Sequence, residues 1–62
     1  MTIVYQVGTR EAIEAEFGID VQHAAAIVQF VDDEVYQWFP CENVEAAKVE
    51  VEEMTDGKVF YL

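Results

Sequence analysis

The chain has 62 residues, and its thirteen acidic and three basic side chains give a formal net charge of −10. A chain of this length forms a single domain, residues 1–62, and buries only about 60% of the surface that its unfolded form exposes. An acidic surface repels phosphate groups and anionic lipids. We therefore expect no direct contact with nucleic acid or a membrane, and a basic surface of another protein as the partner.

Hydrophobic residues make up 53% of the chain, which indicates a folded domain and not a disordered acidic segment. Cys41 is the single cysteine, so no disulfide can form within the chain. The first residues lack the basic region and long apolar core of a signal peptide, and no apolar run approaches the ~20 residues of a membrane span. We expect a cytoplasmic protein. Because a domain this small has a marginal core, a homo-oligomer is a further way to gain stability.

The first third of the chain predicts a strand followed by a helix. Residues 2–7 are rich in β-branched and aromatic side chains, and Gly8 is expected to end the strand. Thr9 can then cap a helix over residues 10–17 through its hydroxyl group. Gly18 is expected to end that helix in a left-handed conformation.

Residues 20–31 have two interpretations. In the helical one, Asp20 is the N-cap, and three consecutive alanines favour the helix. In the other, residues 26–31 form a strand and residues 20–25 are a connector. The following residues favour the strand, because they supply a partner for a hairpin.

Residues 27–44 predict that hairpin and the end of its second strand. An acidic turn interrupts the apolar run where the chain must reverse. The second strand is expected to end at Pro40, which cannot donate a ladder hydrogen bond, and residues 41–45 to form a short turn of 3₁₀ helix. The turn residues are Asp32, Asp33 and Glu34.

Two more strands are expected toward the end of the chain. Residues 48–52 alternate between valine and charged residues, which would direct Val49 and Val51 inward. The dipeptide Asp-Gly at residues 56–57 is the strongest hairpin signal in the chain, and a last strand follows over residues 58–62. The side chains directed outward would be Lys48, Glu50 and Glu52.

The sequence WFPCENVE, residues 38–45, resembles the late segment of Src-homology-3 barrels, where a strand ending in Phe-Pro leads through a 3₁₀ turn into a final strand. It also resembles Tudor-type barrels, in which an apolar strand, an acidic turn and a strand ending in Trp-x-Pro recur. The resemblance covers about residues 27–45 and implies a small β-barrel. Glu42 and Asn43 replace the Asn and Tyr of the Src-homology-3 turn. Because that Tyr lines the groove for proline-rich peptides, the resemblance implies no ligand.

The predicted fold class is therefore mainly β (α+β). It is a small antiparallel five-stranded sheet, or a Src-homology-3-like barrel, with one short helix at about residues 10–17. Most of the aromatic side chains are expected in the core, because a domain this small needs the large area that each of them can bury.

The chain carries no recognisable catalytic or metal-binding motif. It has no serine, and nothing in the spacing of Cys41 and His23 places them together as a nucleophile and its base. A zinc site needs about four ligands, and the acidic turn lacks the ligand spacing of a calcium loop. We expect a protein that is not an enzyme and has neither a metal nor a cofactor.

Charge leads to the first functional hypothesis, a small acidic protein that docks on a basic surface of a larger protein. It could inhibit that protein by imitating nucleic acid, as small acidic proteins of phages and mobile elements do. The alternative for the acidic residues is a coat that only keeps the protein soluble. The candidate partner-binding residues are Asp32, Asp33, Glu34, Glu42, Glu45, Glu50 and Glu52.

The aromatic strand leads to a second hypothesis, a Tudor-like or Src-homology-3-like module. Tyr36 and Trp38 would form an aromatic groove for a basic or methylated peptide, which cation–π attraction beside an acidic rim would favour. A structural subunit of a larger assembly is a third hypothesis.

Overall fold

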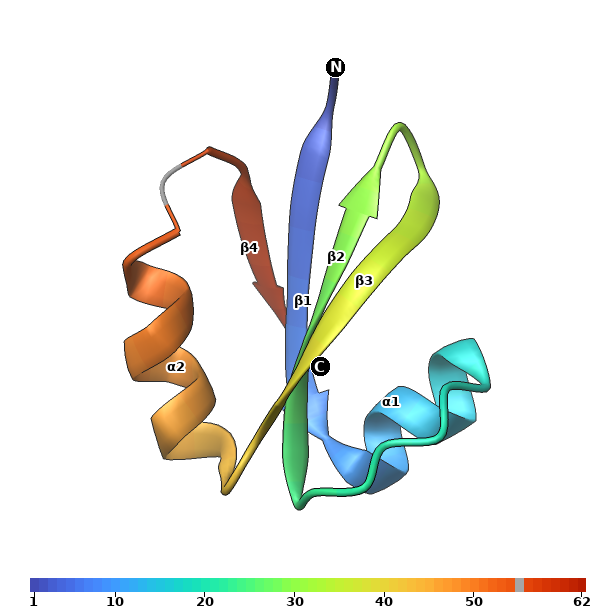
Figure 1. Ribbon diagram of the computed structural model, residues 1–62, viewed down its shortest axis with the longest axis vertical. Coiled ribbons are helices and arrows are strands. Elements are labelled where there is room, and N and C mark those ends of the chain that lie inside the picture. Colours follow the sequence, from blue (N-terminus) through green and yellow to red (C-terminus); the bar gives the residue numbers. More distant parts are fainter. Residues whose placement is uncertain (55) are drawn as a thin grey trace.

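The computed structural model describes residues 1–54 and 56–62. In this part of the chain the elements are β1 (Ile3–Thr9), α1 (Arg10–Phe17), β2 (Ala25–Val31), β3 (Glu34–Cys41), α2 (Val44–Glu52) and β4 (Lys58–Tyr61) (Figure 1).

The strands form one sheet in the order β3-β2-β1-β4. β1 pairs antiparallel with β2, and β2 pairs antiparallel with β3, whereas β4 pairs parallel with β1. A parallel partner requires a crossover connection, and α2 supplies it between β3 at one edge and β4 at the other. β4 forms one edge of the sheet, and in the described residues no strand pairs with its outer side.

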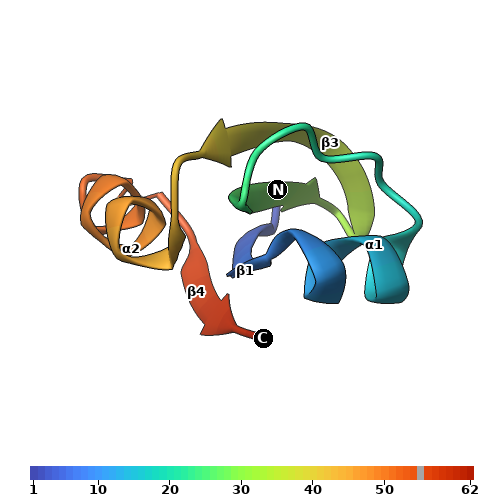
Figure 2. The same ribbon diagram turned by 90° about the horizontal axis from the view of Figure 1, so that it is seen from below.

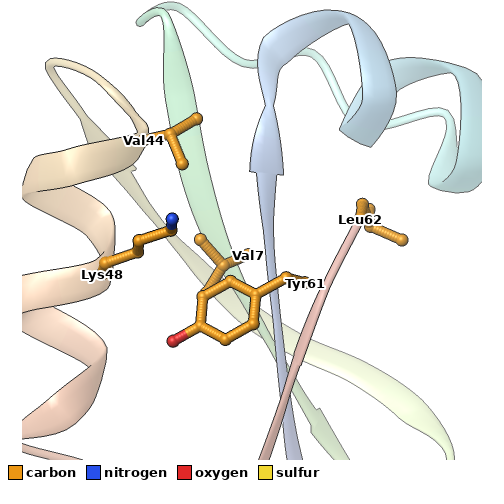
Figure 3. A pocket seen from close by; sticks show the side chains of 5 residues that line it. All are labelled: Val7, Val44, Lys48, Tyr61 and Leu62. Carbon is orange, nitrogen blue, oxygen red and sulfur yellow. The ribbon is translucent and has the colours of Figure 1, made fainter.

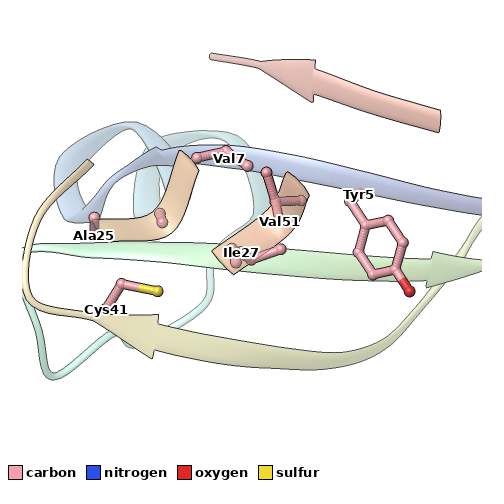
Figure 4. Packing of buried hydrophobic residues seen from close by; sticks show 7 residues of the cluster. Tyr5, Val7, Ala25, Ile27, Cys41 and Val51 are labelled. Carbon is pink, nitrogen blue, oxygen red and sulfur yellow. The ribbon is translucent and has the colours of Figure 1, made fainter. Parts of the chain in front are cut away.

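The two helices cover opposite faces of the sheet (Figure 2). Under α2 lies a buried cluster that includes Val7, Ile27 and Val51 (Figure 4). Under α1 lies a second cluster that includes Ile13 and Val28. Because β2 is central and buried on both faces, its sequence is a continuous apolar run without alternation. That run is buried from Ala25 to Gln29.

The local predictions around α1 are confirmed. The Thr9 hydroxyl accepts a hydrogen bond from the Ala12 amide at 3.2 Å, and Gly18 ends the helix with φ of 68°. The strand interpretation of residues 20–31 is also confirmed, with β2 beginning at Ala25. β1, however, continues through Gly8 to Thr9.

Residues 48–52 are helical, so the strand predicted there is wrong. Asn43 caps α2, because its side-chain oxygen accepts a hydrogen bond from the Ala46 amide at 2.8 Å. Val51 is buried, but Val49 is 65% exposed. Glu50 and Glu52 do not share a face, because residues two apart on a helix do not face each other. The predicted 3₁₀ turn at residues 41–45 is instead the end of β3 and the start of α2.

The hairpin predicted at residues 56–57 is also wrong, because β4 pairs with β1 and not with the segment before the turn. Glycine is required at position 57 because of a close contact, and not because of a turn with positive φ. A Cβ atom on Gly57 would lie 2.5 Å from the Ile3 carbonyl oxygen. The glycine thus lets the chain pass close to the backbone of β1.

The five-stranded sheet and the closed barrel are corrected to an open, mixed, four-stranded sheet with two helices in the described residues. The aromatic core is corrected as well. Aliphatic side chains and alanine make up most of the buried set, whereas Tyr36, Trp38, Phe60 and Tyr61 are exposed. Pro40 does not end β3, which continues to Cys41. An edge strand tolerates proline, because the missing donor can face solvent.

Candidate interaction surface

The β2–β3 turn holds three of the predicted partner-binding residues at its tip. Asp32 and Asp33 both have positive φ, 51° and 69°, as a two-residue hairpin turn of type I′ requires, and Glu34 begins β3 opposite Val31. The Asp32 carboxylate accepts a hydrogen bond from the Thr2 amide at 2.8 Å, and the Asp32 amide donates to the Thr2 carbonyl at 2.8 Å. These bonds fix the turn against the start of β1.

Replacing Asp33 by glycine is expected to stabilise the domain by about 0.5–1 kcal/mol. Glycine adopts positive φ without the steric cost that a Cβ atom imposes, and Asp-Gly is a preferred type I′ pair. Chemical denaturation measures the gain. Asp32→Gly is the matched control, and it should stabilise less, because it also removes the hydrogen bond to Thr2. Equal gains would contradict a structural role for Asp32.

The strand that follows this turn is exposed along most of its length. Glu34 to Trp38 are all exposed, with Tyr36 at 68% and Trp38 at 42%. β3 is an edge strand, and its register with β2 shifts between Gln29 and Phe30. Tyr36 has no residue opposite it there, which makes it the extra residue of a β-bulge. We define Asp32, Asp33, Glu34, Tyr36 and Trp38 as the acidic hairpin surface.

The other predicted acidic residues do not join this surface. Glu42 and Glu45 lie near the start of α2, at the opposite end of the sheet from the β2–β3 turn (Figure 1). The Glu50 carboxylate lies 3.4 Å from the Cys41 sulfur, against β3. Glu52 is exposed near the end of α2. The structure therefore brings together the turn acids and the aromatic strand, but not all seven carboxylates.

Few of the carboxylates are neutralised by a neighbouring cation. Arg10 lies 3.8 Å from both Glu11 and Glu14, and Lys48 lies 3.9 Å from Glu45. Within residues 1–54 and 56–62, the turn acids have no basic group within 4.0 Å. No ion pair within this part of the chain therefore neutralises their charge.

A polar row on the α2 face of the sheet was missed by the sequence analysis. The Gln37 amide donates to Gln29 at 2.6 Å, Gln29 donates to the Tyr5 hydroxyl at 3.2 Å, and that hydroxyl donates to Asp56 at 2.7 Å. Burial raises the pKa of Tyr5, and the hydrogen bond to Asp56 raises it further. A glutamine inside the otherwise apolar β2 was the signal for this row. The row borders an open hollow of about 390 Å³ that Phe39, Glu53 and Met54 also line.

A second hollow, of about 500 Å³, lies between α2 and β4 (Figure 3). The Lys48 ammonium lies 5.7 Å from the centre of the Tyr61 ring, which places it in cation–π range. The remaining lining residues are Val7, Val44 and Leu62. Neither hollow is lined by Tyr36 or Trp38, so these two side chains project from a strand and do not line either cavity.

Cys41 has surroundings that oppose nucleophilic chemistry. The thiol is buried, and its sulfur lies 3.5 Å from the Phe39 carbonyl oxygen and 3.4 Å from the Glu50 carboxylate, so its single hydrogen can be donated to either acceptor. Burial, the hydrogen bond to Glu50 and the charge of Glu50 together raise the pKa of Cys41 to about 11. The thiol therefore stays protonated near neutral pH, whereas a reactive cysteine needs a lowered pKa.

Comparisons of the chain with models of protein families, with curated proteins and with solved structures find no match. None of the helices in the described residues is long and apolar enough to cross a membrane.

Proposed function

We propose that this chain is a small acidic binding protein whose acidic hairpin surface docks on a basic surface of a larger protein. The observation that carries the proposal is the exposure of β3 directly after a turn with three carboxylates. Neither charge nor aromatic exposure is unusual alone, but here one hairpin presents both to solvent.

The two parts of this surface would act at different ranges. The turn acids attract a basic partner over about a Debye length, ~8 Å at physiological salt, and orient its approach. Tyr36 and Trp38 act at contact, because an aromatic ring buries a large area and attracts a cation over its face. Proteins that bind nucleic acid present basic surfaces of this kind, so they are the partner class that the hypothesis of nucleic-acid imitation implies.

Trp38 offers a direct test, because it is the single tryptophan of the chain and belongs to the proposed surface. The probes are a Lys/Arg-rich peptide of about twelve residues, the same peptide with trimethylated lysines, and a neutral Gly/Ser peptide. We expect both charged peptides to change the Trp38 fluorescence and to bind about tenfold more weakly at 0.15 M than at 0.02 M salt. Tighter binding of the methylated peptide would favour the aromatic-groove hypothesis.

Neutralising the three acids of the turn distinguishes binding that depends on these residues from binding that depends only on the net charge of the protein. The variant Asp32→Asn, Asp33→Asn, Glu34→Gln keeps an acceptor for Thr2 and tolerates the positive φ values, since asparagine adopts them readily. We expect it to bind the basic peptide at least about tenfold more weakly, a loss of ~1.4 kcal/mol. The matched control, with the same charge change, is Glu16→Gln, Asp20→Asn, Glu53→Gln. Equal losses in both variants would mean that only net charge matters, and would overturn the proposal.

A further inference from the structure

The free edge of β4 lacks the features that protect the opposite edge of the sheet. β3 carries a bulge and Pro40, both of which hinder pairing with another strand. β4 has neither, and Lys58 at its start is its one charged residue. Phe60 is 51% exposed, and Tyr61 and Leu62 are exposed to a similar degree. An uncovered apolar edge of this kind is a template for a further strand.

The hydrogen bonds to β1 show which backbone groups of β4 face outward. The Leu62 amide donates to the Val7 carbonyl at 2.8 Å, so Leu62 directs its backbone groups toward β1. In a parallel pair, alternate residues bond to the neighbouring strand. The backbone N–H and C=O groups of Phe60 therefore also point toward β1. Those of Val59 and Tyr61 point away from the sheet.

We propose that two copies of this chain associate through antiparallel pairing of their β4 strands, with a two-fold axis at Phe60. Such an axis stands perpendicular to the sheet, so each residue pairs with one on the same face. Val59 of each copy then lies opposite Tyr61 of the other, and Phe60 lies opposite Phe60. The result is one sheet that is continuous through both copies.

This register satisfies the backbone and the side chains together. Val59 and Tyr61 both direct their backbone groups outward, so the two symmetric pairs form about four new hydrogen bonds, as antiparallel hydrogen-bonded pairs do. The side chains form one aromatic pair and two aromatic–β-branched pairs, which are favourable cross-strand pairs. The edge is thus complementary to itself, which a two-fold interface requires.

Charge favours a second copy at this edge more than elsewhere on the surface. Residues 58–62 contain no acid, and Lys48 and Lys58, two of the three basic residues, lie on α2 and β4 at this side. Two chains of charge −10 repel each other least where they meet through such a segment. Pairing would also extend the sheet beside the hollow that Tyr61 and Lys48 line.

Disulfide trapping tests the register. At Phe60 the two Cα atoms would lie about 4.5 Å apart, as in antiparallel pairs without hydrogen bonds, which is within the range that a disulfide spans. We expect Phe60→Cys to form a covalent dimer under mild oxidation. Tyr61→Cys is the control, because its two copies would be displaced by ~6.6 Å along the strand in addition to the ~5 Å between the strands. Their Cα atoms would lie about 8 Å apart, beyond the ~7 Å limit for a disulfide. The native Cys41 is buried and should not interfere.

Sedimentation measurements test the association itself. We expect the unmodified chain to be dimeric at tens of micromolar, and Phe60→Lys to be monomeric with unchanged circular dichroism, because it places two ammonium groups on the axis. Val49→Lys, with the same charge change at an exposed site on α2, should remain dimeric. A monomeric unmodified chain, a dimeric Phe60→Lys variant or equal trapping at residues 60 and 61 would overturn the proposal.

The dependence on salt concentration distinguishes this dimerisation from the proposed binding of a basic partner. Screening weakens the repulsion between two acidic copies, so the dimer should tighten between 0.02 and about 0.15 M salt. Binding of a basic peptide should weaken over the same range. The acidic hairpin surface and the β4 edge lie on opposite edges of the sheet, so either proposal can fail without the other.

Discussion

Replacing Gly57 by alanine is expected to lower the free energy of unfolding by about 2–3 kcal/mol, a typical cost of forcing extra volume into a packed site. The new Cβ atom would lie 2.5 Å from the Ile3 carbonyl oxygen and 2.9 Å from its carbonyl carbon. Backbone atoms in a paired strand cannot move aside, so β4 would have to shift away from β1. For a domain this size the midpoint of thermal unfolding should fall by about 10–20 °C.

Gly8→Ala is the matched control, because it adds the same methyl group at the same strand pair. There the nearest atom is the Leu62 Cβ at 3.1 Å, followed by Leu62 Cδ1 at 3.2 Å. Rotation of the side chain moves Cδ1 away, and a shift of a few tenths of an ångström at Leu62, which follows the last residue of β4, relieves the contact with Cβ, so we expect a loss below about 1 kcal/mol. Thermal melting followed by circular dichroism compares the two variants. Similar losses of unfolding free energy in the two variants would show that the backbone of β1 does not limit the size of the side chain at position 57.

Helix α1 and the β2–β3 hairpin could be predicted because their signals are local. The Thr9 cap and the Gly18 stop lie next to the helix that they bound, and the acidic turn lies between the strands that it joins. Such signals act through neighbours in sequence, so one stretch of the chain contains the whole argument. The prediction therefore did not depend on the rest of the fold.

Helix α2 was mistaken for a strand because an alternation over only five residues is too short to distinguish a strand from a helix that has valines on two different faces. Val49 and Val51 do not share a helix face, and of these two valines only Val51 is buried. The cap by Asn43 and the two alanines of α2 were the local signals for a helix.

The position of β4 could not be predicted from local signals. Its parallel pairing with β1 depends on α2 crossing the sheet, and the Asp-Gly dipeptide at residues 56–57 was interpreted as a hairpin. Asp56 instead accepts a hydrogen bond from Tyr5, and Gly57 makes room for the backbone of β1. Asp56 and Gly57 thus contact β1, and the hydrogen bond between Asp56 and Tyr5 joins residues that are 51 positions apart in the sequence.

The candidate surface was predicted in part. The turn position of Asp32 and Asp33 follows from local sequence, but the exposure of Tyr36 and Trp38 does not. It depends on β3 being an edge strand, with α1 packed mainly on β1 and β2. Exposed aromatic residues on an edge strand add nothing to a small core, which makes them better candidates for contact with a partner than buried ones.

Cys41 is expected to make the domain sensitive to alkaline pH. Its pKa rises from 9.0 when exposed to about 11 in the folded chain, chiefly through burial and then through Glu50. Between these values the folded state holds a proton that the unfolded state has lost. The resulting stability is complete below pH 9 and is lost as the pH rises toward 11, because proton release then favours unfolding. Two pH units correspond to about 2–3 kcal/mol.

Urea unfolding at several pH values measures this loss, and two variants assign it. Cys41→Ala should remove the decline that begins near pH 9 and leave one that begins near pH 10, where the raised pKa of Tyr5 acts with the same sign. Glu50→Gln should reduce the decline without abolishing it, because burial of the thiol remains. A decline from pH 9 that persists unchanged in Cys41→Ala would show that another group causes it, and that Cys41 is not held in its protonated form by folding.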